Sequence, residues 1–294
     1  MNAPLSDTLP RRARRGVERA AAEADARTTA MPLERGEHAC VPATVLAARW
    51  VAPQLRRLTL HVPGLAGWWE PFGPDEFVGL VMPQPGTPLP DLSGVSGPNP
   101  RPVLARMPED VRPDVRWYTV RAYRPDVAEL DLEVVLHPEG EVDEGPGARW
   151  VRAAAPNDEL AVQTGTTCYH PPADARVQVV AGDETAYPSM VGMIERARGS
   201  DVELHVLLEA TPGALPDLPA PERGSLTVVE RDGRPGDALL EVLADADLPD
   251  PDYGWVAGEQ QLAAGVRRHL VRERGVPATS VYFCAYWILG RPRG

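Results

Sequence analysis

The sequence predicts a β + α/β chain, in which an antiparallel β-barrel is followed by an α/β domain. From Cys40 onward, six short β-like runs recur between Pro and Gly breaks, with few helical segments among them. Six strands at this spacing favour a small antiparallel barrel. After Pro171, apolar β-like runs alternate with helical segments, which is typical of a parallel sheet with right-handed crossovers. We therefore predict a flexible or helical tail at 1–36, a barrel domain at 37–170 and an α/β domain at 171–294.

The barrel runs have the residue types and the alternation of strands. In chain order they are VPATVLAARWV, LRRLTLHV, EFVGLVM, RWYTVRAY, LDLEVVLH and DELAVQT. In the fifth run, Leu130 and Leu132 alternate with Asp131 and Glu133, so one face of that strand is apolar. A Pro-rich stretch at 82–102 separates the third run from the fourth and predicts a mobile loop.

The α/β half alternates strands with helices. Its expected elements are the strand RVQVVAG, the helix ETAYPSMVGMIERAR, the strands VELHVLLEA and LTVVER, the helix DALLEVLADA, the strand YGWVAGE, the helix QLAAGVRRHLVRERG and the strand VYFCAYW. In the last helix, Leu262, Val266 and Leu270 recur at helical spacing and predict a buried stripe. Gly275 is a plausible end for that helix.

Composition narrows the function classes. The net charge of −12 disfavours bulk attraction to nucleic acid. No apolar run approaches the ~20 residues that span a bilayer, so no membrane insertion is predicted. The segment after RRARRG is charged, which argues against an export signal. Three widely spaced cysteines form neither a zinc pattern nor a disulfide framework, so a cytoplasmic location and no metal site are expected.

The chain contains no lysine, so all 30 of its Lys and Arg residues are arginine. Lysine Schiff-base chemistry and the P-loop lysine are therefore excluded. A phosphate or carboxylate ligand has to be bound by arginine side chains, backbone amides or helix termini.

Two short motifs suggest a ligand that is both anionic and flat. In RWYTVR, Arg116 and Tyr118 share one face of the expected strand, so a cation and an aromatic ring lie about 7 Å apart. In GPGARW, a glycine turn from Gly145 precedes a short helix and can present unpaired amides to phosphate. Each motif alone also fits a plain turn or an edge strand with solvated arginines.

Taken together, the motifs resemble the siderophore-interacting protein family, the ferric-siderophore reductase branch of the ferredoxin-reductase-like flavoproteins. The resemblance spans roughly residues 38–290. It rests on RWYTVR, on LDLEVVLH, on GPGARW, on APNDEL, on GDETAYP, and on YGWVAGE with the following helix and AYW. It implies FAD as the cofactor.

The resemblance assigns roles to the strand residues. Arg116 is implied to meet the FAD pyrophosphate, and Tyr118 to pack on the isoalloxazine ring. Thr119 is implied to lie near flavin N5, so Tyr118 and Thr119 are the expected catalytic residues. Val120 belongs to the same cofactor-binding run, and Arg121 matches a second family arginine near the flavin or its phosphates.

Further cofactor contacts are implied beyond this strand. His137 is expected to border the cofactor at the end of its strand. The expected pyrophosphate turn consists of Gly145, Pro146, Gly147, Ala148 and Trp150.

The segment GDETAYP is implied to border a nicotinamide pocket. Its expected residues are Asp183, Glu184 and Thr185, with Trp287 from the final AYW motif. Thr185 has an alternative reading as a helix cap. Glu209 ends the next strand, where an acid can bind a ribose hydroxyl, and a solvated strand-end glutamate is the alternative. The expected co-substrate is NADPH or NADH, without a choice between them.

Departures from the family pattern bear on the substrate. The family commonly carries a turn of the form GPASxW, so the chain lacks a serine hydroxyl at Ala148 that is typically worth about 1.5–3 kcal/mol to a charged acceptor. An acidic insertion, PEGEVDEG, precedes the turn, and Ile288 stands where a basic residue is common.

We expect NAD(P)H-dependent reduction of a ferric siderophore or chelate through flavin N5. The alternatives are a related flavoenzyme of natural-product biosynthesis that acts on an organic metabolite, and a non-catalytic binding relative. The sequence makes no prediction about oligomeric state.

Overall fold

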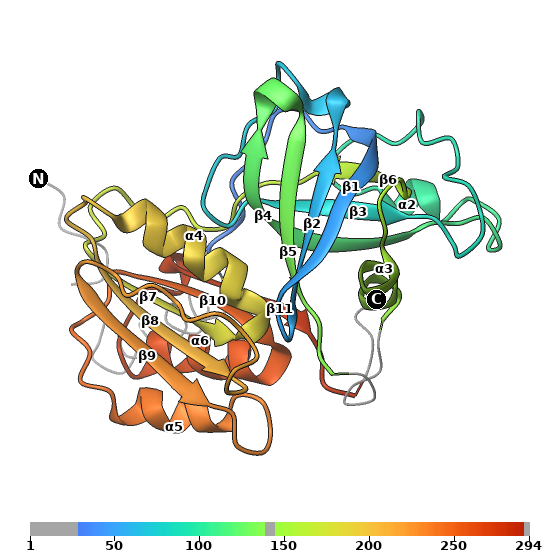
Figure 1. Ribbon diagram of the computed structural model, residues 1–294. Helices are drawn as coiled ribbons and strands as arrows, with labels where there is room; N and C mark the ends of the chain where they lie inside the picture. The colour runs from blue at the N-terminus through green and yellow to red at the C-terminus, as the bar shows by residue number, and fades with distance from the viewer. Residues whose placement is uncertain (1–28, 139–144, 291–294) are drawn as a thin grey trace, which may run out of the picture.

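The computed structural model describes residues 29–138 and 145–290, and Figure 1 shows their arrangement in two lobes. Residues 1–28 of the predicted tail lie outside the described residues, as do residues 139–144 of the acidic insertion. The division of the chain into domains at 37 and 171 stays a prediction.

The first lobe is a closed barrel with the strand order β1-β2-β5-β4-β3-β6. All of its strand pairs are antiparallel, so the predicted six-stranded antiparallel barrel is confirmed. Its strands are β1 (Cys40–Ala52), β2 (Leu55–His61), β3 (Phe77–Met82), β4 (Asp114–Arg124), β5 (Glu129–Val135) and β6 (Glu159–Thr164). Its short helices are η2 (Pro63–Leu65), α2 (Arg101–Leu104), η3 (Pro125–Val127) and α3 (Pro146–Ala153).

The second lobe is a five-stranded parallel sheet in the order β11-β10-β7-β8-β9. Its strands are β7 (Val177–Asp183), β8 (Glu203–Ala210), β9 (Gly224–Glu230), β10 (Tyr253–Glu259) and β11 (Val281–Trp287). Its helices are η4 (Glu184–Ala186), α4 (Tyr187–Ala197), α5 (Asp237–Asp245), α6 (Gln260–Arg272) and η5 (Ala278–Ser280). The predicted α/β fold is therefore confirmed.

Burial on both faces explains why these strands are apolar throughout. Val180 and Val206 pack with α4 on one face of the sheet. Val179 and Leu207 pack with α5 and α6 on the other. Strands covered on both sides are nearly continuous hydrophobic runs. Helix α4 also contacts β4, so it lies between the sheet and the barrel.

In the described part of the chain, no helix combines the length and the apolar character that crossing a membrane requires.

A buried carboxylate joins the two lobes. Asp75, in the loop before β3, is 2% exposed. It accepts hydrogen bonds from the amides of Cys168 and Tyr169, both at 3.0 Å, and from the Thr167 hydroxyl. It also accepts one from the indole nitrogen of Trp255 in β10, at 2.9 Å. Burial raises the pKa of Asp75, and the four donors oppose that shift. The same side chain thus holds the barrel, the linker and the parallel sheet.

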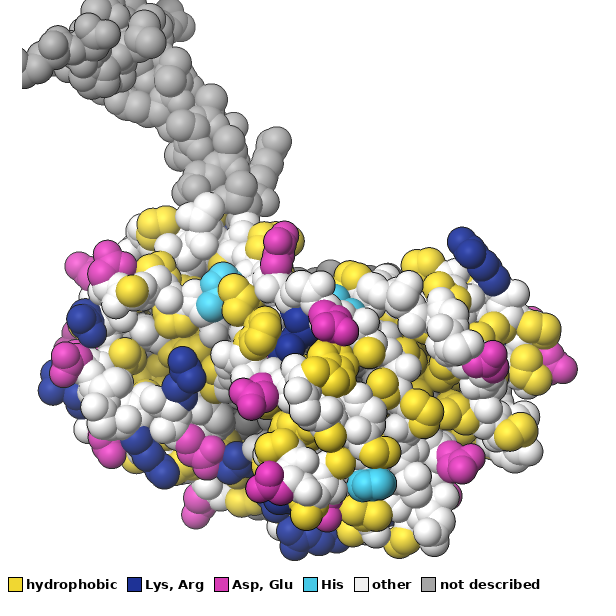
Figure 2. Space-filling view, turned by 90° about the horizontal axis from the view of Figure 1, so that it is seen from above, with side chains coloured by type: hydrophobic (Ala, Val, Ile, Leu, Met, Phe, Trp, Pro, Cys, Tyr) yellow, Lys and Arg dark blue, Asp and Glu magenta, His cyan; other side chains and the backbone are white. Residues whose placement is uncertain are grey.

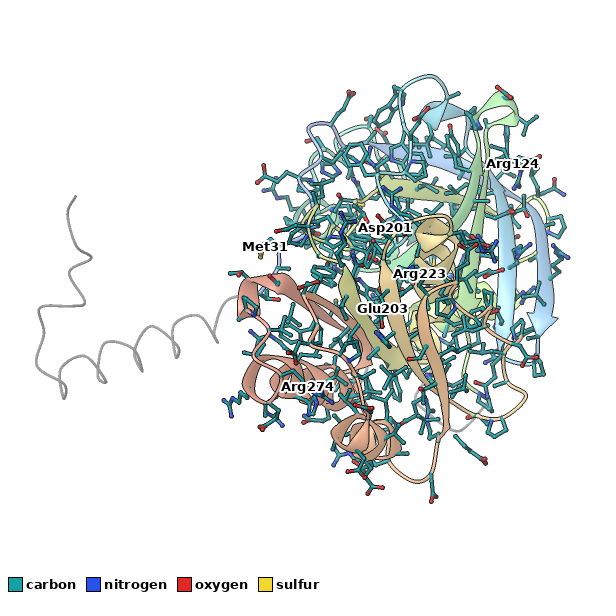
Figure 3. All side chains as sticks on the ribbon, turned by 90° about the vertical axis from the view of Figure 1, so that its left-hand side faces the viewer. Met31, Arg124, Asp201, Glu203, Arg223 and Arg274 are labelled. Carbon is teal, nitrogen blue, oxygen red and sulfur yellow. The ribbon has the colours of Figure 1, made fainter. Side chains whose placement is uncertain are left out.

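Residues 29–38, which we call the N-terminal strap, also contact both lobes. The Thr29 hydroxyl donates to the carbonyl of Val281 in β11 at 2.7 Å. Further along, the Arg35 side chain donates to the carbonyl of Gly165 at 3.0 Å and pairs with Glu76 at 2.8 Å. Figure 3 shows Met31 at the edge of the α/β lobe, far from Arg124 on the barrel. The last part of the predicted tail is therefore bound to the folded protein.

We expect Asp75→Ala to lower the free energy of unfolding by about 2–4 kcal/mol, because four buried donors lose their acceptor. Urea denaturation followed by tryptophan fluorescence measures the change. The matched control is Asp110→Ala in an exposed loop, which we expect to change stability by about 0.5 kcal/mol or less. Equal effects of both substitutions would contradict the role of Asp75.

Candidate functional site

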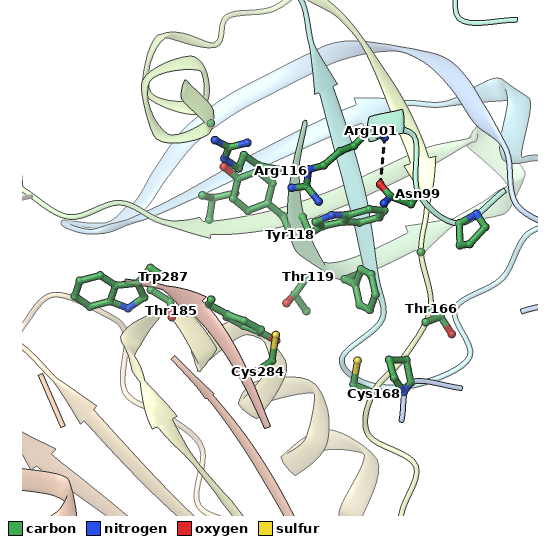
Figure 4. A pocket seen from close by; sticks show the side chains of 18 of the residues that line it. Asn99, Arg101, Arg116, Tyr118, Thr119, Thr166, Cys168, Thr185, Cys284 and Trp287 are labelled. Carbon is green, nitrogen blue, oxygen red and sulfur yellow. Dashed lines mark hydrogen bonds between the residues drawn. The ribbon is translucent and has the colours of Figure 1, made fainter. Parts of the chain in front are cut away.

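A cavity of about 1220 Å³ lies between the lobes. Its walls come from the strap, β4, the end of β5, the start of α3, the linker after β6, and β11. Figure 4 shows Arg116, Tyr118 and Thr119 on the barrel side, facing Thr185, Cys284 and Trp287 on the other. Typical small-molecule pockets measure about 300–1,000 Å³. This cavity is therefore large enough for a dinucleotide and part of a second molecule.

Strand β4 supplies a cation, an aromatic ring and a hydroxyl to the cavity wall. Arg116 is positioned in part by its own strand, because its guanidinium donates to the carbonyl of Val115 at 2.7 Å. Burial raises the pKa of Tyr118, so its phenol stays protonated. The hydroxyl of Thr119 lies 3.0 Å from that of Ser189 in α4, and this hydrogen bond fixes the threonine across the domain boundary.

The start of α3 lies beside Arg116 at the cavity wall. Gly145 is its N-cap residue and Pro146 follows at the first helical position; among the described residues, no cap side chain or first-turn acid accepts from its amides. Gly145, Gly147 and Ala148 all line the cavity. A helix N-terminus without a cap attracts anions through its free amides and its dipole.

Gly147 allows α3 to lie directly against β4. A Cβ atom at this position would be 2.5 Å from the Tyr118 hydroxyl and 2.6 Å from Cγ of Arg116. No side chain fits there without moving both residues. The α3 amides, the guanidinium and the phenol therefore form a single wall of the cavity.

The wall of the cavity on the α/β side is stabilised by hydrogen bonds to the buried side chain of Asp183. Asp183 is fully buried, accepts the indole N–H of Trp287 at 2.8 Å and accepts the amide of Thr185 at 2.9 Å. Asp183, and not Thr185, is the N-cap of η4. Trp287 also packs on His137, with ring centroids 4.8 Å apart. Thr185, His137 and Trp287 line the cavity, whereas Asp183 positions them from outside it.

Glu184 is a second buried acid behind this wall. Its side chain is fully buried and pairs with Arg231. The Nδ1 atom of His137 lies 3.8 Å from its other carboxylate oxygen. Burial, with a contribution from Asp183, raises the pKa of Glu184 to about 7, although Arg231 opposes the shift.

Not every expected site residue reaches the cavity. Val120 is 8% exposed and packs in the barrel core, while its amide donates to the carbonyl of Glu76 at 2.7 Å. The ladder between β4 and β5 is irregular at Arg121, because Val120 and Ala122 pair with consecutive residues of β5. Such a bulge redirects a side chain. Pro146, Trp150, Asp183 and Glu184 also adjoin the cavity without lining it.

Arg121 instead joins the two lobes. Its guanidinium donates to both carboxylate oxygens of Glu195 in α4, at 3.0 and 2.7 Å. Arg121 does not line the cavity, and the bulge accounts for its direction; its expected role near the flavin or its phosphates stays a prediction.

Some cavity residues had no individual assignment from the sequence. Alternation within VYFCAYW was an available signal, since it places the cavity residues Tyr282, Cys284 and Tyr286 on one face of β11. No local pattern indicated the others, because they come from loops and from the strap. They include Pro32, Leu33, Glu34, Arg35, Glu37, His38, Asn99, Arg101, Thr166 and Cys168.

Two family models match the chain. The siderophore-interacting FAD-binding domain matches residues 44–166, and the siderophore-interacting protein model matches residues 175–290. Together they cover the barrel and the parallel sheet. The chain belongs to the siderophore-interacting protein family.

Named relatives of this family align with most of the chain. Ferric vibriobactin reductase ViuB of Vibrio cholerae is 27% identical over 83% of this chain and 87% of its own length. The mycobactin import ATP-binding/permease protein IrtA of Mycolicibacterium smegmatis is 30% identical over 61% of this chain. The chain spans only 20% of IrtA, so it corresponds to a part of that larger protein.

Solved structures agree with this membership. The siderophore-interacting protein SipS from Aeromonas hydrophila is 28% identical, with a TM-score of 0.67 over 87% of this chain and 93% of SipS. A ferredoxin reductase in carbazole 1,9a-dioxygenase is 16% identical, with a TM-score of 0.58 over 85% of this chain and 70% of its own, and shares the fold alone. The chain thus has an FAD-binding domain in a ferredoxin-reductase-like fold, and that domain contains Arg116, Tyr118 and the start of α3.

We expect Gly147→Ala to lower the free energy of unfolding by about 1–3 kcal/mol and to weaken FAD binding, because a new Cβ displaces Arg116 and Tyr118. Thermal denaturation of the flavin-free protein and titration with FAD measure the two effects. Gly145→Ala is the control in the same turn, since its Cβ meets no described atom within 4 Å. Wild-type behaviour of Gly147→Ala would show that α3 is not packed as described.

We expect Glu184→Gln to remove a pH dependence of stability. The folded pKa of Glu184 is about 7 and lies above the ordinary value of 4.5, so the folded state holds an extra proton between these values. The stability of the wild type should therefore fall, relative to the variant, as pH rises through this window, and then level off. Melting temperatures at a series of pH values measure the difference. A difference that does not vary with pH would contradict the expectation.

Proposed function

We propose that this protein is an FAD-dependent oxidoreductase that reduces ferric ion held in a small-molecule chelate. The observation that supports this most is the single wall formed by the open start of α3, Arg116 and Tyr118. The wall offers cationic and amide donors next to an aromatic face, and FAD carries a pyrophosphate next to a flat ring system. Membership of the family adds ferric-chelate reduction as the reaction class, by analogy with ViuB.

In this proposal the residues of the barrel bind and orient the cofactor. The guanidinium of Arg116 and the amides of Gly147 and Ala148 bind the pyrophosphate, because each can donate to phosphate oxygens. The Tyr118 ring packs against the isoalloxazine. Thr119 would lie near N5 of the bound flavin, and its bond to Ser189 keeps the hydroxyl in place. When bound, FAD supplies the capacity to accept a hydride and to release single electrons.

The residues of the α/β domain form the second wall and limit water access. Trp287 and Thr185, both held by Asp183, face the barrel across the cavity. The expected reductant is NADH or NADPH, and its nicotinamide would approach this wall. The ferric ion arrives inside its chelator, so it is substrate and needs no ligand from the protein.

The charges that line the cavity favour a chelate of low net negative charge. Arg35 is paired with Glu76, and Glu133 is paired with Arg57. The other charged lining residues are Glu34, Glu37, Arg101 and Arg116, and their formal charges sum to zero. Ile288 adds an apolar side chain to the lining of the cavity. On the face shown in Figure 2, acidic and basic side chains are interspersed and form no basic patch.

The deciding experiment begins with the visible spectrum of the purified protein after incubation with FAD. Bound oxidised flavin, bleached by anaerobic photoreduction and restored by a ferric chelate such as ferric vibriobactin, would support the proposal. Bound flavin that no ferric chelate reoxidises would favour an organic substrate. Failure to retain FAD would favour a non-catalytic relative.

We expect Arg116→Ala to weaken FAD binding by about 2 kcal/mol or more, which is about 30-fold, because a charged partner of the pyrophosphate is lost. Quenching of flavin fluorescence on titration measures the affinity. Arg121→Ala is the matched control, since this arginine of the same strand faces Glu195 instead of the cavity. Loss of FAD affinity in the Arg121 variant alone would reverse the assignment.

A further inference from the structure

In open α/β sheets, the pyrophosphate of a dinucleotide binds beyond the carboxyl ends of the strands, at helix N-termini. Three helical segments start at this edge here: η4, which leads into α4, and the helices α5 and α6. A nicotinamide dinucleotide needs the amides of at least one of them. Each of the three starts is already satisfied by a carboxylate of the chain itself.

The start of α5 is capped by Glu209. Its carboxylate accepts the amide of Gly236 at 2.7 Å and that of Leu239 at 3.0 Å. The Glu209 side chain is fully buried and also lies 3.5 Å from Arg231. Glu209 is therefore neither the ribose-binding acid nor the solvated glutamate that its position at the end of β8 suggested.

The start of α6 is capped by Glu259, which is 2% exposed. Its carboxylate accepts the amide of Gln261 and, at 3.3 Å, that of Leu262. Its other oxygen accepts the amide of Leu289 at 3.2 Å, just after β11. This acid thus closes the helix start and ties down the chain that follows the sheet.

The backbone after β7 has few amides to offer a ligand, because Asp183 accepts from some of them and Pro188 has none. Asp183 accepts the amide and the hydroxyl of Thr185, and also the amide of Glu259 at 2.6 Å. Pro188, within the first turn of α4, has no N–H to offer. Ser189 is fully buried and directs its hydroxyl toward Thr119 of the barrel.

The buried carboxylates at this edge of the sheet also disfavour a pyrophosphate through their charge. Asp183, Glu184, Glu209 and Glu259 are all buried at one edge of the sheet. Arg231, whose side chain is 10% exposed, is paired with Glu184 and lies near Glu209. A pyrophosphate here would have to displace a buried carboxylate or lie beside one, and like charges at such distances repel strongly in a protein interior. The start of α3 differs in that its first turn, Pro146 to Ala148, carries no acid and no described side chain caps it; the acids at 139–144 lie outside the described residues.

We infer that the α/β domain, as far as it is described (to residue 290), has no pyrophosphate site and that a nicotinamide donor is recognised only through its nicotinamide half, at the cavity wall formed by Thr185 and Trp287. The inference rests on the proposed function for the identity of the donor. The absence of a pyrophosphate site rests on the three capped helix starts alone.

The test uses the FAD-loaded protein, because ADP-ribose shares its ADP part with FAD and would otherwise enter the α3 site. Calorimetric titration with ADP-ribose and with its 2′-phosphate should give no saturable binding below about 1 mM, the range of very weak complexes. In anaerobic stopped flow, NADH and dihydronicotinamide riboside, which lacks every phosphate, should reduce the flavin with second-order rate constants within tenfold of each other. ADP-ribose should not compete with NADH.

Three results would overturn the inference. They are saturable binding of ADP-ribose or its 2′-phosphate to the FAD-loaded protein, competition of ADP-ribose with NADH, and a rate constant for NADH more than tenfold above that for dihydronicotinamide riboside. The flavin-free protein provides the positive control, since it should bind ADP-ribose at α3 and lose this binding in Arg116→Ala. Failure of that control would count against the proposed FAD site, whereas the result with the loaded protein bears on the α/β edge. If neither NADH nor dihydronicotinamide riboside reduces the flavin, the titration with ADP-ribose alone decides whether the α/β domain has a pyrophosphate site.

Discussion

The cavity depends on the hydrogen bonds of Asp75. A barrel and a parallel sheet joined by a short linker have no fixed separation of their own, and interfaces between domains of one chain commonly permit relative motion. Asp75 removes this freedom, because its carboxylate is satisfied only when the linker amides and Trp255 of the sheet converge on it. The bonds from Thr119 to Ser189 and from Arg121 to Glu195 then form at set distances. The wall that carries Tyr118 and the wall that carries Trp287 are thereby kept apart at a constant spacing.

The two domains differ in how the N-termini of their helices are capped. Every helix start presents amides that need acceptors. In the α/β domain, buried acids at the ends of β7, β8 and β10 supply them, and this makes the edge rigid and already anionic. In the barrel, α3 begins with glycine and proline, and Arg116 lies beside it. One physical requirement thus yields structural caps at the starts of η4, α5 and α6, whereas the start of α3 is left for the anion that we propose.

The parts of the fold that depend on local pattern were predictable, and those that depend on tertiary contacts were not. Alternation in LDLEVVLH and the continuous apolar run RVQVVAG indicated the barrel and the buried sheet. Strand alternation predicted that Arg116 and Tyr118 share a face, and the structure does place both on the cavity; their roles toward FAD were implied by the family resemblance. The bulge at Arg121 is set by pairing with β5, and the strap by contacts with residues more than a hundred positions away. No single-strand pattern contains that information. Glu209 was misjudged for the same reason, since its partners lie in the loop before α5 and in that helix.

The departure from the family turn at 147 and 148 can be understood as one coupled change. Replacing serine by Ala148 removes a hydroxyl that would donate to phosphate, which alone would weaken an anion site. Replacing alanine by Gly147 removes the methyl group that would collide with Arg116 and Tyr118. Helix α3 can then approach β4, and its amides and the guanidinium converge on the same space in the cavity. The α3 amides and the Arg116 guanidinium are all donors, so a phosphate placed between them would receive charge-assisted hydrogen bonds from both. The turn is therefore still suited to a pyrophosphate, through backbone groups in place of a side chain.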